Sequence, residues 1–284
     1  MIRAIILDID GVIVGQKIGF NFPSPHEDVL KKLREIKEKG IAIALCTAKP
    51  AYAISDIIEG AQLNNPHITD AGAVIINPID TVIVEKHVIE KDFVKNVLET
   101  CLSHNIYVEL YTVDEYFIQQ NQVGEITEKH KPILRRDPIV VSSLLHELSQ
   151  QDVVRIMPIA KDEEDKKRVA DLLDGYKNTL SISWGLHPSA LPLQFGIITS
   201  LGSSKKEGAE AVVKNLNLSF EDVLGIGDTT GDWSFMQLCG HVATVENGSS
   251  ELKDLLRTKG EGKYFIGKSV DENGILDIFN FFQI

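Results

Sequence analysis

The segment RAIILDIDGVIV, residues 3–14, begins with an unbroken aliphatic run and then carries two aspartates, Asp8 and Asp10, followed by Gly11. An apolar run without polar alternation is typical of a strand that is covered on both faces, as in the parallel sheets of α/β proteins. We therefore predict a buried strand over residues 3–8, with helices on both sides of its sheet. The two carboxylates come at the end of this strand.

The same alternation of strand and helix is present at both ends of the chain. HEDVLKKLREIKEKG has apolar residues on one helical face and stops at Gly40, and aliphatic runs at 41–46 and 73–76 follow, with a helical segment between them. Near the C-terminus we expect a helix over 205–218, a strand over 222–228, and then a further helix and the strand HVATV. This order predicts an α/β fold with a doubly wound parallel-sheet (Rossmann-like) core.

The middle of the chain has a different pattern. Residues 79–190 combine alternating or aromatic strand candidates with helices expected over 90–103 and 163–174. That pattern is typical of an open α+β sheet inserted into another domain. We therefore predict a core formed by residues 1–78 and 191–284, with an inserted α+β cap domain over residues 79–190.

The composition excludes several other classes of protein. The 284-residue chain carries a formal net charge of −12, which disfavours a nucleic-acid binder that depends on overall positive potential. Its three cysteines are scattered and form no CxxC pair, so neither a disulfide framework nor a zinc site is expected. No apolar run approaches the ~18 to 20 residues of a membrane span. We therefore expect a soluble, cytoplasmic protein with no membrane partner, and the pattern does not indicate an oligomeric state.

Several reactive side chains are expected at one edge of the core sheet. In an open parallel sheet, ligands bind at the carboxyl ends of the strands, and three of the predicted strands end there in polar residues. The pattern SSKKE also predicts an N-cap at Ser204, which puts the next residue in the first turn of a helix. The residues expected together at this edge are Asp8, Asp10, Thr47, Lys205 and Asp228.

These residue types suit phosphoryl transfer to and from a carboxylate. Asp8 can attack phosphorus as a nucleophile, and Asp10 can protonate the leaving oxygen and then activate water. Thr47 and Lys205 can hold the phosphoryl oxygens. A hard divalent cation such as Mg²⁺ prefers oxygen ligands, which Asp8 and Asp228 can supply. Taken singly, each residue is more readily explained as a turn, a helix cap or a strand-end hydroxyl, so the interpretation depends on the whole set.

In this order, the motifs resemble those of the haloacid dehalogenase-like superfamily of Mg²⁺-dependent phosphatases. LDIDGVI is similar to the nucleophile motif of that superfamily, LCTAKP to the second motif, Lys205 to the third and GIGDTTGD to the fourth. The insertion lies between the second and third motifs, where the sugar-phosphatase branch carries a large cap called class IIB. The resemblance implies Mg²⁺ held by Asp8, Asp10 and Asp228, with Asp232 as a further ligand or as a hydrogen-bond partner of the ligands.

Two positions depart from the pattern of that branch. Gly231 precedes Asp232 where the branch usually has Asn, so an amide near the metal site is missing and Asp232 or water is expected to substitute for it. Asp70 stands where Asn is common. The second departure bears on a substrate or loop contact and not on the chemistry.

Candidate substrate contacts in the predicted cap are less specific. Arg135 and Arg136 form a candidate anion clamp, although a pair of arginines in a loop is usually a solvated surface. Aromatic and basic residues on the cap strands can line a substrate cleft, although strand aromatics more often pack in a core or across strands. These candidates are Trp184, His187, Tyr111, Tyr116 and Arg155. Cys46 is expected to be a small buried apolar residue.

The leading functional hypothesis is a phosphatase, a hydrolase of phosphoric monoesters, that acts on a small phosphorylated metabolite such as a sugar phosphate. It would use an aspartyl-phosphate intermediate, which a phosphomutase of the same fold would also use. A receiver-like signalling domain also combines aspartates, Thr and Lys on a parallel sheet, but an insert of ~110 residues is hard to reconcile with one compact receiver. A non-catalytic binding protein is a further alternative, against which the complete set of residues argues.

Overall fold

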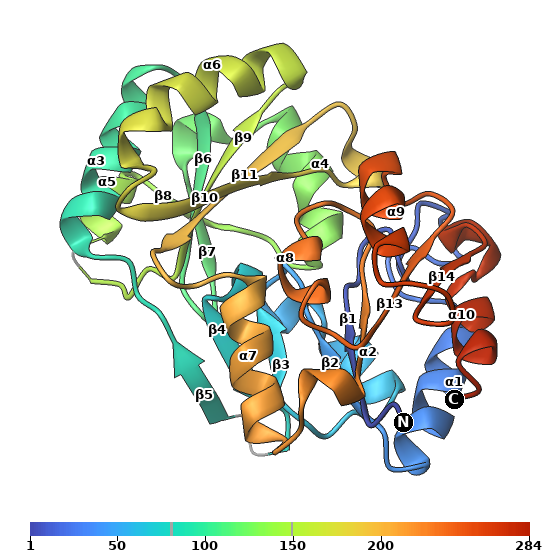
Figure 1. Ribbon diagram of the computed structural model, residues 1–284. Helices are drawn as coiled ribbons and strands as arrows, with labels where there is room; N and C mark the ends of the chain where they lie inside the picture. The colour runs from blue at the N-terminus through green and yellow to red at the C-terminus, as the bar shows by residue number, and fades with distance from the viewer. Residues whose placement is uncertain (80–81, 149) are drawn as a thin grey trace.

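A computed structural model of the protein describes residues 1–79, 82–148 and 150–284. It contains a five-stranded sheet in which all neighbouring strands are parallel, in the order β14-β13-β12-β1-β2 (Figure 1). The strands are β1 (Ala4–Leu7), β2 (Ala42–Leu45), β12 (Val223–Ile226), β13 (His241–Val245) and β14 (Tyr264–Gly267).

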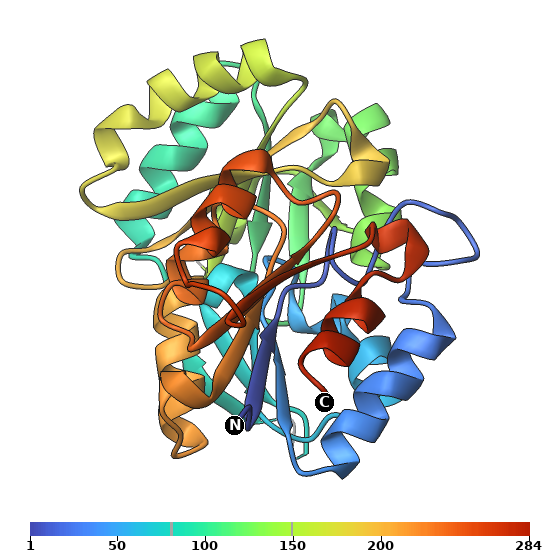
Figure 2. The ribbon, with the colours of Figure 1, turned by 45° about the vertical axis from the view of Figure 1, so that its right-hand side comes forward.

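Helices cover both faces of this sheet. In β1, Ile5 and Leu7 belong to one apolar cluster, while Ala4 and Ile6 belong to another. The alternation follows from the two-residue period of a strand and explains why the run is apolar throughout. One face is covered by α1 (Glu27–Glu38), α2 (Ser55–Gly60) and α10 (Ile275–Phe281), and the other by α7 (Lys205–Asn215), α8 (Trp233–Met236) and α9 (Ser250–Arg257) (Figure 2). The predicted doubly wound α/β core is therefore confirmed.

A six-stranded sheet lies beside the core, in the order β10-β11-β9-β6-β7-β8 (Figure 1). Its strands are β6 (Tyr107–Tyr111), β7 (Tyr116–Gln119), β8 (Ile139–Val141), β9 (Arg155–Ala160), β10 (Leu180–Gly185) and β11 (Gln194–Ser200). One face packs against α3 (Lys91–Ser103), α5 (Leu144–Glu147) and α6 (Glu163–Leu173), so the helices predicted over 90–103 and 163–174 are confirmed. The other face packs on α4 (Glu125–Leu134) and on Ala73 and Val74 of the core. This shared apolar cluster seats the six-stranded sheet on the core.

The strand predicted over 73–76 is not a further strand of the parallel sheet. It forms β4 (Val74–Asn77), which pairs antiparallel with β3 (His67–Thr69) and β5 (Val82–Lys86) in a separate three-stranded sheet. Asp70, Ala71 and Gly72 have positive φ angles of 50°, 57° and 100°, and they reverse the chain between β3 and β4. The predicted strand is therefore confirmed, but its place in the parallel sheet is wrong, because the apolar pattern of residues 73–76 does not report this reversal.

The strand pairings also bear on the predicted domain boundaries. β11 pairs with β9 and β10 in the six-stranded sheet, although its residues lie in the segment 191–284 that we assigned to the core. β5 pairs with β4, although it lies in the predicted cap segment 79–190. Asp80 and Thr81, near the start of that segment, lie outside the described residues. The division into core and cap stays a prediction.

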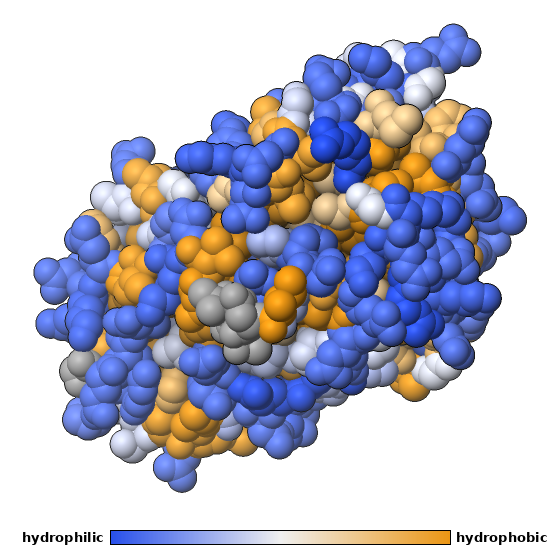
Figure 3. Space-filling view, turned by 90° about the horizontal axis from the view of Figure 1, so that it is seen from below, coloured by the Kyte–Doolittle hydropathy of each residue, from blue (hydrophilic) through white to orange (hydrophobic). Residues whose placement is uncertain are grey.

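The surface seen from below is mostly hydrophilic, with separate hydrophobic patches among the hydrophilic residues (Figure 3). Both chain termini lie on the side of the molecule that contains the five-stranded sheet (Figure 1). Among the described residues, we find no helix that is both long enough and apolar enough to cross a membrane.

Candidate active site

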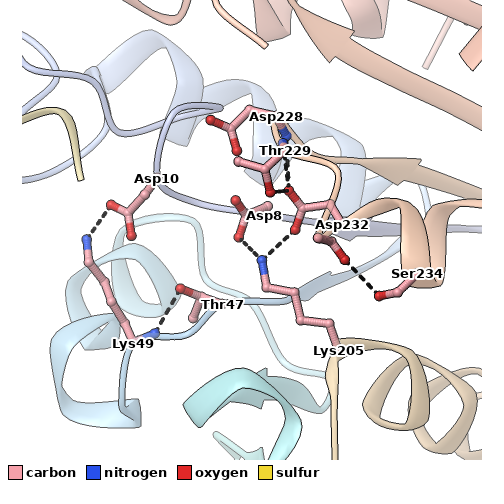
Figure 4. A network of polar contacts seen from close by, with 10 residues as sticks. Asp8, Asp10, Thr47, Lys49, Lys205, Asp228, Thr229, Asp232 and Ser234 are labelled. Carbon is pink, nitrogen blue, oxygen red and sulfur yellow. Dashed lines mark hydrogen bonds and ion pairs between the residues drawn. The ribbon is translucent and has the colours of Figure 1, made fainter. Parts of the chain in front are cut away.

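The carboxyl ends of three neighbouring parallel strands bring the predicted residues together. Asp8 follows β1, Thr47 follows β2 and Asp228 follows β12. Lys205 is the first residue of α7, and Ser204 is its N-cap, as predicted. A cavity of about 340 Å³ opens over this edge of the sheet. The predicted residues that line it, which Figure 4 shows, are Asp8, Asp10, Thr47, Lys205, Asp228 and Asp232.

Lys205 lies between two carboxylates. Its Nζ is 2.8 Å from Oδ1 of Asp8 and 2.5 Å from Oδ1 of Asp232 (Figure 4). Burial favours the neutral amine, but the charges of Asp232 and Asp8 outweigh burial and hold the pKa of Lys205 well above its usual value. Lys205 is therefore an ammonium at neutral pH, directed into the cavity.

The carboxylates of Asp8, Asp228 and Asp232 form a compact cluster. One oxygen of each lies within 4.8 Å of the others. Burial raises the pKa of Asp8 to about 7 in spite of the nearby ammonium. Burial, together with the charges of Asp8 and Asp232, raises the pKa of Asp228 well above its usual value. Like charges this close repel, so the cluster fits a divalent cation, and its all-oxygen donor set fits a hard ion such as Mg²⁺.

Among the residues that the structure describes, Asp10 lies outside the cluster of Asp8, Asp228 and Asp232. Its Oδ1 accepts hydrogen bonds from Nζ of Lys49, at 2.6 Å, and from Nε2 of His187, at 3.1 Å. Burial alone would raise the pKa of Asp10, but the charges of Lys49 and His187 outweigh burial and hold the pKa well below its usual value. Asp10 is thus held as a carboxylate at the cavity, and its role as a metal ligand stays a prediction.

Lys49 is a site residue that the sequence reasoning missed. It lies two residues after Thr47 in the segment LCTAKP, and its backbone N–H donates to Oγ1 of Thr47 at 3.1 Å. The backbone N–H of Thr47 donates in turn to the carbonyl of Ile68 at 3.0 Å. The only signal in the sequence was a cation close to a strand-end hydroxyl, which is too common a pattern to identify a site.

Asp232 holds the loop that carries Asp228. Its Oδ2 accepts hydrogen bonds from the backbone N–H groups of Asp228 and Thr229, at 3.2 and 3.0 Å, and from the Thr229 hydroxyl, at 3.0 Å. Its other oxygen contacts Lys205. With Gly231 in place of the usual Asn, these contacts of the loop come from Asp232 itself.

The structure separates the candidate substrate contacts. Trp184 lines the cavity over Asp8. His187 and Arg155 line a smaller cavity of about 80 Å³ that also borders Asp10. Both cavities share the β10–β11 region, so these three side chains are near the site, as the sequence predicted for a substrate cleft.

The other four candidates have different surroundings. Arg135 and Arg136 each form an ion pair with a carboxylate of the protein. Tyr111 and Tyr116 are buried and stack on each other, with ring centroids 5.5 Å apart. None of the four is among the described residues that line the 340 Å³ cavity. The predicted anion clamp is therefore not formed at this cavity, and the two tyrosines pack between the six-stranded sheet and the core. Cys46 is buried, as predicted.

Comparison with known proteins identifies the class that this fold and site define. The haloacid dehalogenase-like hydrolase family matches residues 5–279, and the chain belongs to this family. Among curated relatives, 5-amino-6-(5-phospho-D-ribitylamino)uracil phosphatase of Bacillus subtilis is 22% identical over 297 residues, which cover 96% of this chain and 95% of the relative. Phosphatase YwpJ of the same species is 19% identical over 269 residues, which cover 89% of this chain and 92% of the relative.

Solved structures share the fold. A haloacid dehalogenase-like hydrolase from Bacteroides thetaiotaomicron superposes with a TM-score of 0.82 at 18% identity, covering 99% of both chains. A subclass IIB sugar phosphatase of the same superfamily superposes with a TM-score of 0.78 at 20% identity, again covering 99% of both chains. The predicted superfamily, its cap-bearing fold and the hydrolase class are therefore confirmed, and the receiver-like alternative is set aside.

Proposed function

We propose that this hydrolase is a Mg²⁺-dependent phosphatase that acts on a small phosphorylated metabolite through an aspartyl phosphate on Asp8. The observation that carries the proposal is the distance of 2.8 Å between Nζ of Lys205 and Oδ1 of Asp8. Asp10 and Asp228 line the same cavity. A cation beside a carboxylate nucleophile suits the transfer of an anionic phosphoryl group. The phosphatase names of the two Bacillus subtilis relatives support the same reaction.

In the first half of the reaction, an oxygen of Asp8 bonds to phosphorus while the bond from phosphorus to the ester oxygen breaks. The negative charge of the bound phosphoryl group favours the protonated form of Asp10, which gives its proton to that oxygen, and the oxygen leaves as an alcohol. Lys205 and Thr47 hold the equatorial phosphoryl oxygens, over which charge spreads. In the second half, Asp10 takes a proton from the water that attacks phosphorus, and inorganic phosphate and the Asp8 carboxylate are released.

The carboxylates of Asp8 and Asp228 would hold the cation, because their oxygens converge, whereas both oxygens of Asp232 already accept hydrogen bonds. When bound, Mg²⁺ offsets the repulsion between the carboxylates and the phosphoryl group. Lys205 bridges Asp8 and Asp232, so the orientation of the nucleophile is set by side chains of this protein. Lys49 and His187 favour the ionised form of Asp10, which is the form that serves as a base in the second half of the reaction.

The cavity wall formed by the β10–β11 region supports a proposal for the substrate class. Among the described residues, the charged side chains that line the cavity all belong to the phosphoryl site, and the β10–β11 wall has none. That wall includes Ser181, Ser183, Leu186 and Ile197, with Ser183 directly opposite Ile197 in the strand pair. Hydroxyl groups and apolar surface suit a neutral, hydroxyl-bearing leaving group, because a second anionic group would be desolvated there without a partner. We therefore propose a sugar phosphate or a related polyol phosphate, and one relative is named for a phosphorylated ribityl compound.

A phosphate-release screen over phosphorylated metabolites tests the proposal. With Mg²⁺ present, we expect release from sugar monophosphates to exceed release from sugar bisphosphates and phosphorylated carboxylic acids. Excess chelator should abolish it, and Asp8→Asn serves as the inactive control. Release that persists after verified removal of metal, or in Asp8→Asn, would contradict the proposal. A bisphosphate product without free phosphate would favour the phosphomutase alternative.

A further inference from the structure

His187 reaches the catalytic edge from the six-stranded sheet. It lies in the loop between β10 and β11, and its Nε2 is 3.1 Å from Oδ1 of Asp10. Its side chain is buried, and its ring packs edge-on against Phe22 of the core, with centroids 5.9 Å apart. A side chain outside the core motifs therefore contacts the residue proposed as acid and base.

The contacts of the His187 ring determine which nitrogen carries the proton. The backbone N–H of Ser189 donates to Nδ1 at 3.2 Å, and the Ser189 hydroxyl lies 2.7 Å from the same atom. A nitrogen that accepts a backbone hydrogen bond has no proton of its own, so in the neutral ring the proton is on Nε2. His187 therefore donates to Asp10 without needing a positive charge.

The two partners of Asp10 come from different parts of the fold. Lys49 follows β2 of the core, while His187 comes from the β10–β11 loop, and both contact Oδ1. Within the part of the chain that the structure describes, Oδ2 of Asp10 accepts no hydrogen bond. Two donors on one oxygen fix the rotation of the carboxylate and leave the other oxygen for the ester oxygen of the substrate.

We propose that His187 is a positioning residue, through which the β10–β11 loop orients Asp10 for proton transfer to the leaving group. This inference rests on the proposed phosphatase function. The consequence is that the acid is correctly oriented only while the loop is seated over it, so the six-stranded sheet contributes to proton transfer as well as to the cavity wall.

Two substitutions separate the contacts of the two ring nitrogens of His187. His187→Gln keeps an N–H donor at about the distance of Nε2 and so retains the contact with Asp10. His187→Asn keeps an acceptor at the position of Nδ1, and so retains the contact with Ser189, but its side chain is too short to reach Asp10. The pair differs by one methylene and by which of the two contacts is kept, and the proposal requires only the contact with Asp10.

The measurement is the ratio of two kcat/KM values, one for a sugar phosphate and one for 4-nitrophenyl phosphate. The first leaving group needs a proton and the second does not, and kcat/KM covers the steps up to formation of the phosphoenzyme. For His187→Asn we expect kcat/KM for the sugar phosphate to fall about tenfold or more, which is part of the ~10² to 10⁴ usual for general acid catalysis. We expect kcat/KM for 4-nitrophenyl phosphate to change by less than about threefold. His187→Gln should recover most of the ratio.

Because both values come from one preparation, their ratio does not depend on the fraction of folded enzyme. Equal losses on the two substrates, an unchanged ratio in His187→Asn, or a Gln variant that behaves like the Asn variant would overturn the role of His187. Failure of the phosphatase proposal has a different signature, since the unsubstituted protein would then release phosphate from neither ester, or Asp8→Asn would remain active.

Discussion

Lys205 determines the charge balance of the site at the scale of single residues. The buried carboxylates of Asp8 and Asp232 lie within reach of the half-buried carboxylate of Asp228, and the ammonium of Lys205 contacts the two buried ones. Thr229 and the backbone after β12 satisfy the remaining oxygen of Asp232. The oxygens of Asp8 and Asp228 on the cavity side are consequently the groups that a cation and a phosphoryl group would meet.

Asp8 and Asp10 should fail in different ways when their charge is removed. Asp8→Asn lacks the proposed nucleophile and should form no phosphoenzyme. Asp10→Asn keeps the nucleophile, so with 4-nitrophenyl phosphate an aspartyl phosphate should form and then hydrolyse ~10² to 10⁴ times more slowly, for lack of a base. Rapid quench followed by intact-protein mass measurement detects the intermediate. A phosphoenzyme in Asp8→Asn would show that another residue is the nucleophile.

Gly11 allows the chain to pass close to Asp228. Its φ angle is +79°, and a Cβ at this position would lie 2.1 Å from Oδ2 of Asp228. Gly40, which follows the C-cap of α1, has a similar φ of +84°, and a Cβ there would have nothing within 4 Å, which makes it a matched control. Both Ala variants should lose about 1 to 2 kcal/mol from the left-handed backbone, but only Gly11→Ala displaces Asp228.

We therefore expect Gly11→Ala to lose about 10²-fold in kcat/KM, as for a displacement of about 1 Å at a catalytic group, and to bind Mg²⁺ more weakly. Gly40→Ala should keep normal activity at a similarly lowered midpoint of urea unfolding. Enzyme kinetics and calorimetric Mg²⁺ titration measure the two effects. Equal activity in the two variants would mean that the contact with Asp228 is not important.

At the scale of secondary-structure elements, β2 is the edge strand of the five-stranded sheet, and side chains accept hydrogen bonds from the backbone on its outer edge. The backbone N–H of Ile43 donates to Oδ1 of Asn65 at 3.1 Å, and the N–H of Leu45 donates to Nδ1 of His67 at 3.2 Å. Beyond them, an isolated parallel bridge joins Cys46 to the segment that contains β3. An unpaired strand edge is thereby satisfied without a sixth parallel strand.

His67 should make the stability of the protein dependent on pH. Burial lowers its pKa from the usual 6.5 to about 3 in the folded state. Between these values the unfolded chain binds a proton that the folded chain does not, so stability is lost as pH falls, by up to about 1.4 kcal/mol per pH unit from this group.

The test compares the urea-unfolding free energy of His67→Asn with that of the unsubstituted protein from pH 7 to pH 4.5. Asn can accept the Leu45 hydrogen bond but does not titrate, so it should cost stability at pH 7 and progressively less as pH falls. The buried carboxylates of the site contribute equally to both proteins and cancel in the difference. A difference that is constant across this range would show that His67 is not responsible.

At the scale of the whole molecule, Arg155 joins the six-stranded sheet to the core. It begins β9, and its guanidinium donates to the carbonyl of Ala48, next to Thr47. The same group stacks over Tyr111, 3.8 Å from the ring centroid, and pairs with Asp70 at 3.3 Å, with both charged side chains fully buried. Burial raises the pKa of Asp70 to about 6 in spite of this pairing.

Removing only the cation should be costly, because it leaves Asp70 buried without a partner. We expect Arg155→Met to lose on the order of 3 to 5 kcal/mol of unfolding free energy at pH 8. The loss should be smaller at pH 5, where Asp70 takes up a proton and avoids the charge. The double variant with Asp70→Asn removes both charges and should recover part of the stability and lose the pH dependence. Urea unfolding at both pH values measures this, and an equal loss in single and double variants would contradict it.

Much of the site could be predicted because its signals are local. Unbroken apolar runs identified β1, β2 and β12 as doubly covered strands, and Asp8, Thr47 and Asp228 lie one or two residues after the ends of these strands. Since the carboxyl ends of neighbouring parallel strands meet at one edge of a sheet, order along the chain was enough to bring these residues together. The N-cap at Ser204 made the position of Lys205 predictable in the same way.

The partners of Asp10 were decided only by the tertiary structure. Lys49 and His187 are 138 residues apart in sequence. Both contact Oδ1 of Asp10 because the β10–β11 loop is seated on the core. The reversal that turns β4 away from the parallel sheet, and the pairing of β11 with the six-stranded sheet, likewise depend on backbone angles and strand pairing rather than on residue pattern. Periodicity along a chain states which face of an element is buried, whereas the partner of that face is selected by packing between segments far apart in sequence.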